Sequence, residues 1–260
     1  MNYQLKETPS LKRIASTKNE RVKEWKKLQS RKKREERGLF LIEGLHLIEE
    51  ALKYKSIVQE LIVLDGAKLP NHFFEGTIPT TIVSKEVFSL LSETDSPQGV
   101  MAVCKQLRWE IDLNAKKWLL IDAVQDPGNL GTIIRTADAA GMDVVILGDG
   151  TVDLYNSKTI RATQGSIFHL PVVNSSLKQI INKLKKEKIP VFGTSIKNAV
   201  FYKEIPPSET FALLVGNEGN GVSKELLDMT DQNLHIPIYG KAESLNVAVA
   251  SAIFMYHLRK

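Results

Sequence analysis

The residues that could carry chemistry stand in three segments, each where a predicted strand gives way to a helix. The first segment contains Asn129 and Arg135, the second Glu218, and the third Ser244 and Asn246. A helix start presents unpaired backbone N–H groups, and a Ser or Asn there can either cap the helix or bind a ligand. Capping or turn formation would explain each segment alone, so their common position is the informative feature.

The first segment runs from Gln125 to Gly131 and leads into a predicted helix that carries Arg135. Its Pro-Gly pair favours a turn, Asn129 can cap the helix, and Gly131 permits close approach of another backbone. One turn further on, Arg135 could pair with a phosphate through its planar guanidinium group. The alternative is a surface arginine that pairs with Asp138 at helical spacing.

The second segment is the glycine-rich turn from Gly216 to Gly221. It does not match the dinucleotide-binding fingerprint, because the carboxylate of Glu218 in its middle would repel a phosphate. Glu218 suits a neutral or cationic ligand, or a salt bridge to an arginine such as Arg135 or Arg161. Ordinary turn chemistry is the alternative interpretation.

Several other kinds of site are disfavoured by the sequence. There is no Gly-x-Ser-x-Gly elbow, no phosphate-binding loop that ends in Gly-Lys-Ser/Thr, and no His-Glu-x-x-His pair. The five histidines lack ligand spacing, and Cys104 is the single cysteine, which excludes an internal disulfide. We therefore expect no metal site.

Composition indicates an ordinary globular protein of 260 residues, 43% hydrophobic and 25% charged, which is long enough for two modest domains. No apolar run approaches the roughly 20 residues that a membrane helix needs. Met1 to Lys12 lacks the apolar core of a secretory signal. We therefore expect a cytoplasmic protein without a membrane partner.

Positive charge is concentrated at the N-terminus. Residues 1–37 carry 13 Lys and Arg against 5 Asp and Glu, whereas residues 38–260 carry 22 against 25. Such a basic segment could contact phosphates of a nucleic acid. With Glu20, Glu24, Glu35 and Glu36 interleaved, a solvated helix face is an equal alternative.

The N-terminal half predicts a basic helix followed by a compact α/β domain. Val22, Trp25 and Leu28 form an apolar stripe at helical spacing within residues 19–37, which we expect to be one helix ending at Gly38. The further predicted elements are strands at 39–42, 60–64, 80–83 and 99–104 and helices at 44–54 and 84–93. These elements define a domain over residues 1–105, followed by a linker at 106–116.

The C-terminal half, residues 117–260, predicts a second and larger α/β domain. Its predicted strands are 118–122, 144–147, 170–173, 190–194, 210–215 and 234–238, and its helices are 130–140, 158–163, 177–186, 223–229 and 245–259. Near-continuous apolar strands such as Phe211–Val215 suit a parallel sheet covered on both faces. Ligands of such sheets bind beyond the carboxyl ends of the strands, which is where all three segments fall.

Together the three segments resemble the signature motifs of the SpoU (TrmH-type) family of RNA 2'-O-ribose methyltransferases, part of the SPOUT superfamily. The motifs are Asn129-x-Gly131-x-x-x-Arg135-x-Ala137-x-x-x-Gly141, then Leu214-Val215-Gly216-Asn217-Glu218-Gly219-x-Gly221, then Ile236-Pro237-Ile238 with Ser244-Leu245-Asn246-Val247-Ala248-Val249-Ala250. This resemblance covers about Trp118 to the C-terminus. The N-terminal half also resembles the family's small substrate-binding domain, similar to a ribosomal-protein L30-like fold, through Phe40-Leu41-Ile42-Glu43-Gly44 and Ser96-Pro97-Gln98-Gly99-Val100.

The resemblance implies a fold and a cofactor that the pattern alone does not. The fold is α/β, with a C-terminal domain whose parallel sheet is closed by a deep trefoil knot and a small L30e-like N-terminal domain. The cofactor is S-adenosylmethionine, contacted largely through backbone groups at Gly216, Ile236 and Leu245, with Thr194 nearby. A homodimer is also implied, in which each active site borrows residues from the partner chain.

The resemblance likewise implies roles for five residues, namely Asn129, Arg135, Glu218, Ser244 and Asn246. Arg135 is the family's candidate for activating the ribose 2'-hydroxyl. Because a guanidinium stays protonated at nearly any accessible pH, orienting the hydroxyl and holding the adjacent phosphate suit it better than acting as a base. Asn129 and Ser244 would position the ribose, and Glu218 would hold Arg135 or Asn129.

The expected activity is therefore methylation of a ribose 2'-hydroxyl in RNA, with ribosomal RNA of the 23S type as the expected substrate and no DNA partner. A transfer RNA substrate is the first alternative. A non-catalytic RNA-binding module is a second, although such a module would be free to lose the five polar residues. A base methyltransferase is a third, disfavoured by the Asn-Gly-Arg pattern of the first motif.

Overall fold

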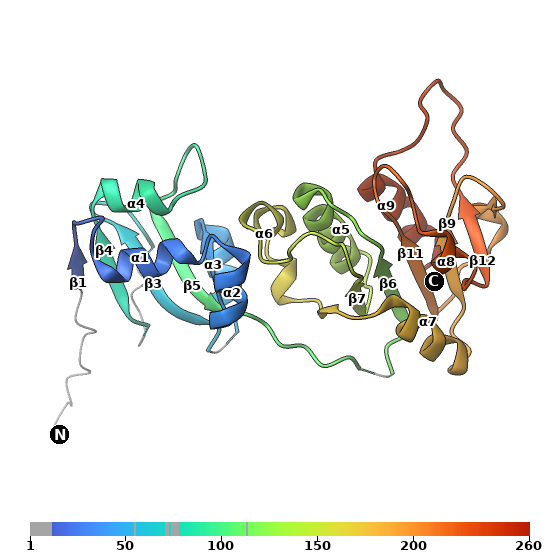
Figure 1. Ribbon diagram of the computed structural model, residues 1–260, viewed down its shortest axis with the longest axis horizontal. Helices are drawn as coiled ribbons and strands as arrows, with labels where there is room; N and C mark the ends of the chain where they lie inside the picture. Colours follow the sequence, from blue (N-terminus) through green and yellow to red (C-terminus); the bar gives the residue numbers. More distant parts are fainter. Residues whose placement is uncertain (1–11, 55, 71–72, 74–77, 113) are drawn as a thin grey trace. The chain divides into compact units, whose positions relative to one another are not determined.

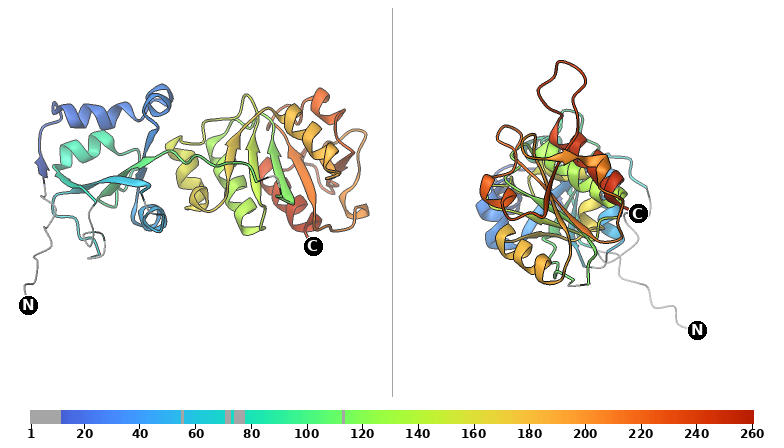
Figure 2. Two further views of the ribbon diagram at one scale, coloured as in Figure 1. Left: turned by 90° about the horizontal axis from the view of Figure 1, so that it is seen from below. Right: turned by 90° about the vertical axis from the view of Figure 1, so that its right-hand side faces the viewer.

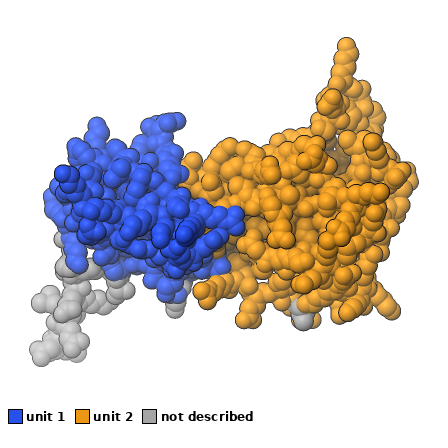
Figure 3. Space-filling model, viewed as in Figure 1, with its two compact units in different colours: residues 1–107 blue, residues 108–260 orange. Residues whose placement is uncertain are grey.

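The computed structural model describes residues 12–54, 56–70, 73, 78–112 and 114–260. The chain divides into two compact units, residues 1–107 and 108–260 (Figure 3). Residues 1–11, on which the expectation about a secretory signal largely rests, lie outside the described residues. In the described ranges, no helix has the length and apolar character to span a bilayer.

Unit 1 (residues 1–107) is built on a five-stranded sheet with strand order β1-β4-β3-β5-β2 (Figure 1). The strands are β1 (Lys12–Ile14), β2 (Leu39–Glu43), β3 (Val58–Leu64), β4 (Thr80–Val83) and β5 (Val100–Lys105). Strands β1, β4 and β3 are parallel, whereas β5 runs antiparallel to both β3 and β2. The predicted strands are confirmed. β1 was not predicted, because three residues with two charged side chains give no apolar pattern.

The basic segment forms two helices, so the prediction of a single helix is wrong. They are α1 (Glu20–Lys27) and α2 (Arg31–Arg37). The side chain of Arg34 in α2 turns inward, only 6% exposed, and donates from Nη1 to the carbonyl oxygens of Leu28 and Gln29 between the two helices, both at 2.8 Å. This buried guanidinium satisfies carbonyl groups that a continuous helix would have paired along its own axis, and so stabilises the break.

The predicted apolar stripe of the basic segment is confirmed as part of the core. Val22, Trp25 and Leu28 are at most 4% exposed, and they pack with α4 (Lys85–Leu91) over one face of the sheet (Figure 2). Helix α3 (Leu45–Leu52) packs against β2 and β5. The basic segment is therefore an integral layer of unit 1.

The charges of the basic segment are largely compensated within unit 1. Buried Glu60 accepts hydrogen bonds from Trp25 Nε1 at 3.0 Å and Thr81 Oγ1 at 2.8 Å, and it forms an ion pair with Arg21 at 2.9 Å. The interleaved glutamates pair with neighbouring cations, namely Glu20 with Lys23, Glu24 with Lys27 and Arg37, Glu35 with Arg31, and Glu36 with Lys33. The pattern favours the solvated helix face over a free phosphate-binding arm.

Unit 2 (residues 108–260) is built on a seven-stranded sheet with order β10-β12-β9-β11-β6-β7-β8, in which every pairing is parallel. The strands are β6 (Lys117–Ile121), β7 (Val144–Leu147), β8 (Val172–Asn174), β9 (Val191–Thr194), β10 (Val200–Phe201), β11 (Phe211–Val215) and β12 (Gln232–His235). All residues of β7 and β11 are buried. The predicted parallel sheet covered on both faces is confirmed.

Two sets of helices cover the two faces of this sheet (Figure 2). The helices are α5 (Pro127–Ala139), α6 (Ser157–Thr163), α7 (Leu177–Lys186), α8 (Lys224–Leu227) and α9 (Val247–Leu258). Trp118 and Leu120 of β6 pack with residues of α7 and α8. Side chains alternate along a strand, so Leu119 and Ile121 face the opposite side, where α5 and α9 pack together.

Two predicted boundaries near the C-terminus are wrong. Strand β12 ends at His235, so Ile236, Pro237 and Ile238 do not continue it. Pro237 has no N–H group and cannot donate to a strand ladder. Helix α9 begins at Val247 rather than at Leu245, because Asn246 is its N-cap.

Candidate active site

The carboxyl ends of β6 and β11 lie side by side, since these strands pair with Ile121 opposite Val215. From here the chain leaves in opposite directions, because β6 is followed by β7 on one side and β11 by β12 on the other. Ligands of open parallel sheets bind at the crevice that such a reversal creates. The segments that follow the two strands carry Asn129 and Glu218, so both belong to this edge of the sheet.

Asp126 caps helix α5, whereas the sequence indicated Asn129 for that role. The Oδ1 atom of Asp126 accepts a hydrogen bond from the backbone N–H of Asn129 at 2.8 Å, and Pro127 occupies the first turn. Oδ2 of Asp126 lies 3.0 Å from Nζ of Lys158. The pKa of Asp126 is lowered, first by the bond from the Asn129 amide and then by the bond from Lys158. Asp126 is thus ionised at neutral pH.

Glu218 joins the loop after β11 to the loop after β6. Its Oε2 accepts from the backbone N–H of Gln125 at 3.1 Å, and its Oε1 accepts from that of Asp126 at 3.0 Å. Partial burial alone would raise the pKa of Glu218, but the hydrogen bonds from Asn129, Gln125 and Asp126 together outweigh it and lower the pKa. The carboxylate therefore acts as an ionised acceptor that fixes the turn before α5.

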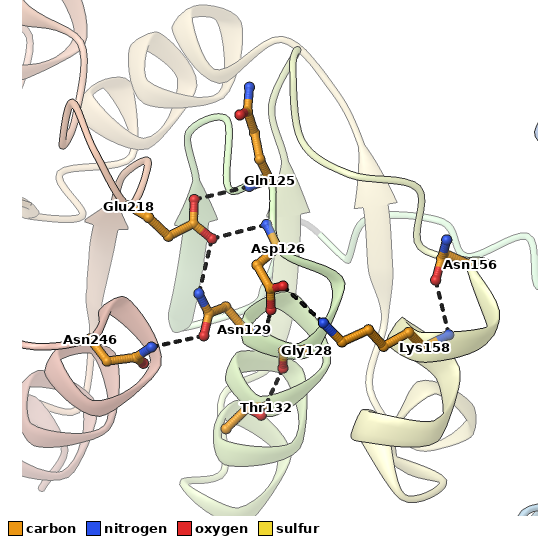
Figure 4. Close-up of polar contacts among 9 residues, drawn as sticks. All are labelled: Gln125, Asp126, Gly128, Asn129, Thr132, Asn156, Lys158, Glu218 and Asn246. Carbon is orange, nitrogen blue, oxygen red and sulfur yellow. Dashed lines mark hydrogen bonds and ion pairs between the residues drawn. The ribbon is translucent and has the colours of Figure 1, made fainter. Parts of the chain in front are cut away.

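Asn129 connects all three segments (Figure 4). Its Nδ2 donates to Oε1 of Glu218 at 3.0 Å, and its Oδ1 accepts from Nδ2 of Asn246 at 2.9 Å. Of the alternatives predicted for Glu218, the contact with Asn129 is found. Three of the five polar residues singled out from the sequence are thus in direct contact, although 89 and 117 positions separate them from Asn129.

Asn246 also starts helix α9. Its Oδ1 accepts from the backbone N–H groups of Ala248 at 2.8 Å and Val249 at 3.3 Å. The oxygen therefore serves the cap while the amide nitrogen reaches Asn129, which requires both halves of the side-chain amide. Capping and site formation are combined in this residue.

Arg135 and Ser244 are exposed and do not join this network. Among the residues that the structure describes, neither side chain has a hydrogen bond or ion pair. Asp138, the alternative partner of Arg135, instead contacts Nδ1 of His169 at 3.0 Å, so the alternative of an Arg135–Asp138 surface pair is not found. Both side chains are available to a ligand or to a second chain.

Three residues expected near the cofactor lie at the carboxyl ends of three adjacent strands. Thr194 ends β9 and donates from Oγ1 to the carbonyl oxygen of Leu214 at 3.1 Å. Gly216 directly follows β11, and Ile236 directly follows β12. The order β12-β9-β11 makes these strand ends neighbours.

Gly216 is required by its own loop. A Cβ atom there would lie 2.2 Å from the backbone of Gly221 and Val222. The close approach follows from two backbone hydrogen bonds between Asn217 and Gly221, at 3.0 and 2.9 Å. The glycine-rich pattern thus reflects a tight turn, as one interpretation of the sequence held.

The loop between β12 and α9 offers backbone groups to a ligand. From Tyr239 to Leu245 the backbone has no hydrogen-bond partner within the described residues. Leu245 is 36% exposed and Tyr239 is 89% exposed. An S-adenosylmethionine molecule, which carries amino, carboxylate and adenine groups, fits such a set of free N–H and C=O groups.

Sequence reasoning missed two residues of this network. Asp126 precedes Pro127, and an acidic residue before a proline at a helix start is a recognisable cap signal. Lys158 gave no signal, since its contact with Asp126 depends on how α6 packs against α5. No group of three or more metal-ligating side chains occurs in the part of the chain described.

Comparison with family models places the same two segments of the chain in known families. Residues 116–256 match the SpoU rRNA Methylase family, and residues 19–102 match an MRM3-like substrate binding domain. The matches correspond to most of unit 2 and most of unit 1.

Individual relatives agree with these matches. The chain is 54% identical over 249 residues, 96% of its length and 100% of the relative's, to the 23S rRNA (guanosine(2553)-2'-O)-methyltransferase RlmP of Bacillus subtilis. An AdoMet-bound rRNA methyltransferase from Sinorhizobium meliloti superimposes with a TM-score of 0.84 at 32% identity, covering 95% of this chain and 97% of that one. The SpoU methyltransferase AviRb from Streptomyces viridochromogenes, in complex with AdoMet, gives 0.85 at 26% identity over 93% and 97%. The chain therefore belongs to the SpoU rRNA methylase family.

Proposed function

We propose that the chain transfers a methyl group from S-adenosylmethionine to the ribose 2'-hydroxyl of a nucleotide in 23S ribosomal RNA. The observation that carries the proposal is the bridge of Asn129 between Glu218 and Asn246, which gathers three motifs at the ligand-binding edge of the sheet. The Bacillus subtilis relative is named for this reaction, and it matches along nearly the whole chain.

For the cofactor, we propose backbone contacts at Gly216, Ile236 and Leu245, with Thr194 nearby. Bound S-adenosylmethionine supplies an electrophilic methyl group on a positively charged sulfur. The strand ends that carry Thr194, Gly216 and Ile236 are adjacent, and the free backbone groups before α9 support a ligand there. These strand ends and the loop before α9 would hold the cofactor.

The substrate ribose would be positioned by Asn129 and Ser244, while Asn246 holds the side-chain amide of Asn129. Methyl transfer is an in-line displacement in which the carbon–sulfur bond breaks, the carbon–oxygen bond forms, and the hydroxyl proton leaves to water. Glu218 accepts a hydrogen bond from Nδ2 of Asn129. The orientation of the Asn129 side-chain amide is therefore set before the substrate binds. Exposed Ser244 has a free hydroxyl for the ribose.

Arg135 would orient the 2'-hydroxyl and hold the adjacent phosphate. Its guanidinium is exposed and without a partner in the described chain, so it can form two parallel hydrogen bonds to a phosphate. A protonated guanidinium next to the developing alkoxide stabilises the negative charge. The base role stays the weaker alternative.

We propose that the chain acts as a homodimer and that the partner covers α9. This helix consists mostly of apolar residues, and Val249 and Tyr256, two turns apart, are 50% and 54% exposed. Helix α5, which carries Arg135, packs beside it. A second copy on this surface would bring Arg135 of one chain near the site of the other.

We also propose that unit 2 contains a deep trefoil knot and that unit 1 binds RNA. A cytoplasmic location is proposed as well. The final helix α9 packs back on α5 and β11, and Arg259 bridges to Ser208 ahead of β11, which supports threading of the C-terminal segment. The match of residues 19–102 to a substrate binding domain supports a role of unit 1 with RNA.

The test is transfer of tritium from labelled S-adenosylmethionine to total RNA from cells that lack the protein, followed by mapping of the ribose-methylated nucleotide. Label in 23S RNA that resists alkaline cleavage is the expected result. Label only in transfer RNA would favour the tRNA alternative, and label released on a base would favour base methylation. No label on any RNA would contradict the proposal.

A further inference from the structure

Lys158 lies beside the reaction site without belonging to any of the three motifs. Its Nζ is 3.0 Å from Oδ2 of Asp126 (Figure 4), and the end of its side chain lies beside Gly128, where a Cβ atom would meet Cε at 3.4 Å. The side chain is 58% exposed, so this pair by itself contributes little stability. Its contact with Asp126 indicates a role in the geometry of the site instead of in stability.

The position of Lys158 is fixed by the packing of α6 on α5. Asn156 caps α6 by accepting from the backbone N–H of Lys158 at 2.9 Å. At Gly131 the two helices approach so closely that a Cβ atom would lie 2.4 Å from the carbonyl oxygen of Thr159. The base of the Lys158 side chain is therefore held on a rigid element, which is what a positioning group requires.

Asp126 is the group through which Lys158 reaches the site. Oδ1 of Asp126 holds the backbone N–H of Asn129 at 2.8 Å, and the backbone N–H of Asp126 is held by Glu218 at 3.0 Å. The carboxylates of Asp126 and Glu218 thus both accept from backbone N–H groups at the start of α5, and their negative charges repel each other. Lys158 is the cation that contacts Asp126, and it offsets this repulsion while keeping Oδ1 aimed at Asn129.

We propose that Lys158 is a positioning residue for methyl transfer, which holds Asp126 so that the first turn of α5 presents Asn129 to Glu218 and Asn246. The inference rests on the proposed function. Lys158 acts through Asp126 and touches neither of the two groups that Asn129 bridges. Loss of the lysine leaves the binding of cofactor intact and shifts Asn129 within the site, and small misplacements of this kind slow turnover.

The test compares full-length Lys158→Met, Lys158→Arg, Asp126→Asn and the double variant Lys158→Met/Asp126→Asn with wild type, using 23S RNA from cells that lack the protein. We expect Lys158→Met to lower kcat by about tenfold with the KM for S-adenosylmethionine unchanged, and Lys158→Arg to restore most of it. The double variant is expected to be no slower than the slower single variant, because the two residues act in series. Lys178→Met is the control, since Lys178 pairs with Glu225 in the same unit but on α7.

An independent readout is amide hydrogen exchange of residues 125–131. We expect faster exchange at Asn129 in Lys158→Met and unchanged exchange in Lys178→Met, whether or not RNA is present. An unchanged kcat with unchanged exchange would overturn the inference. A raised KM for RNA with normal kcat would overturn it too, since Lys158 would then contact the phosphate backbone directly. Wild-type protein that methylates no RNA would refute the proposed function alone, because the exchange measurement still tests Lys158.

Discussion

Asn246 donates from Nδ2 to Oδ1 of Asn129 at 2.9 Å, while its own Oδ1 accepts from the backbone N–H groups of Ala248 and Val249 in the first turn of α9. One side chain therefore starts the C-terminal helix and orients the central amide of the site. The two tasks use different atoms of the same amide, so substitutions can separate them.

Asn246→Asp should keep the cap and lose the contact with Asn129. A carboxylate accepts from the N–H groups of Ala248 and Val249 but cannot donate to Oδ1 of Asn129. We expect wild-type thermal stability and a strongly reduced kcat. Asn246→Ala should lose both, with a stability loss of about 0.5–2 kcal/mol. A kcat for Asn246→Asp equal to wild type would contradict the role of the Asn129 contact.

Arg135→Ala should abolish turnover while leaving cofactor affinity and stability intact. The side chain is exposed and has no partner in the described part of the chain, so its loss should change stability by less than about 0.5 kcal/mol. Arg135→Lys keeps the charge but not the planar fork, and we expect it to remain well below wild type. Calorimetric titration with S-adenosylmethionine and single-turnover methylation measure the two effects. Near-normal methylation by Arg135→Ala would remove Arg135 from the mechanism.

Protonation of Glu218 should loosen the turn before α5. The pKa of Glu218 is lower in the folded chain than its ordinary value, so the ionised form stabilises the fold above the unfolded pKa. This contribution disappears as the pH falls through the folded pKa. We expect the hydrogen-exchange protection of the Gln125 and Asp126 amides, relative to their intrinsic rates, to decrease once the pH drops below the ordinary pKa of a glutamate, about 4.3. Glu218→Gln should show lower protection that does not vary in this range; equal pH profiles for both proteins would contradict the prediction.

The site could be predicted from sequence to the extent that it depends on local signals at strand ends. Asn129, Glu218 and Asn246 were found because each stands in a recognisable turn or helix start. Their contacts were not predictable in detail, because they depend on the pairing of β6 with β11 and on the packing of α9 beside α5. Lys158 lay beyond sequence reasoning for the same reason.

In the fold, too, elements with a strong local pattern could be predicted, whereas features that depend on tertiary contacts could not. Long apolar strands such as β11 and the amphipathic helix α7 were predicted because their patterns are strong. The split of the basic segment was not, since it depends on the inward turn of Arg34, a residue type usually placed outside. The two-residue β10 is too short for any periodic signal.

Deleting residues 1–37 should unfold unit 1 and therefore cannot report on phosphate contacts. Trp25 is 4% exposed in the core and bonds to Glu60, so even Trp25→Ala should cost about 3–5 kcal/mol. A milder variant removes exposed Lys32, which has no ion pair in the described chain, by Lys32→Gln. Because most charges of this segment are compensated, we expect the salt dependence of RNA affinity to stay unchanged. A slope reduced by about one would show that the segment does contact phosphate.

Charge on the exposed face of α9 should separate the proposed dimer. Val249 is 50% exposed there, and Val249→Glu would place a carboxylate in an apolar interface. We expect the mass in solution, from light scattering, to fall from two chains to one. Leu90→Glu in unit 1, where Leu90 is 37% exposed, is the matched control and should not change the mass. A monomeric wild type would contradict the dimer.

Mixing two inactive variants should then restore activity. If Arg135 of one chain serves the site that contains Asn246 of the other, a dimer of Arg135→Ala with Asn246→Asp has one site with both residues intact. Random exchange of chains makes about half of the dimers mixed, so about a quarter of the wild-type sites should reappear. If both residues act within one chain, every site in the mixture lacks one of them and activity stays absent. Methylation measured before and after co-refolding of the two variants distinguishes these outcomes. When Val249→Glu is added to both variants, no recovery of activity is expected in either case, because the chains should not form dimers.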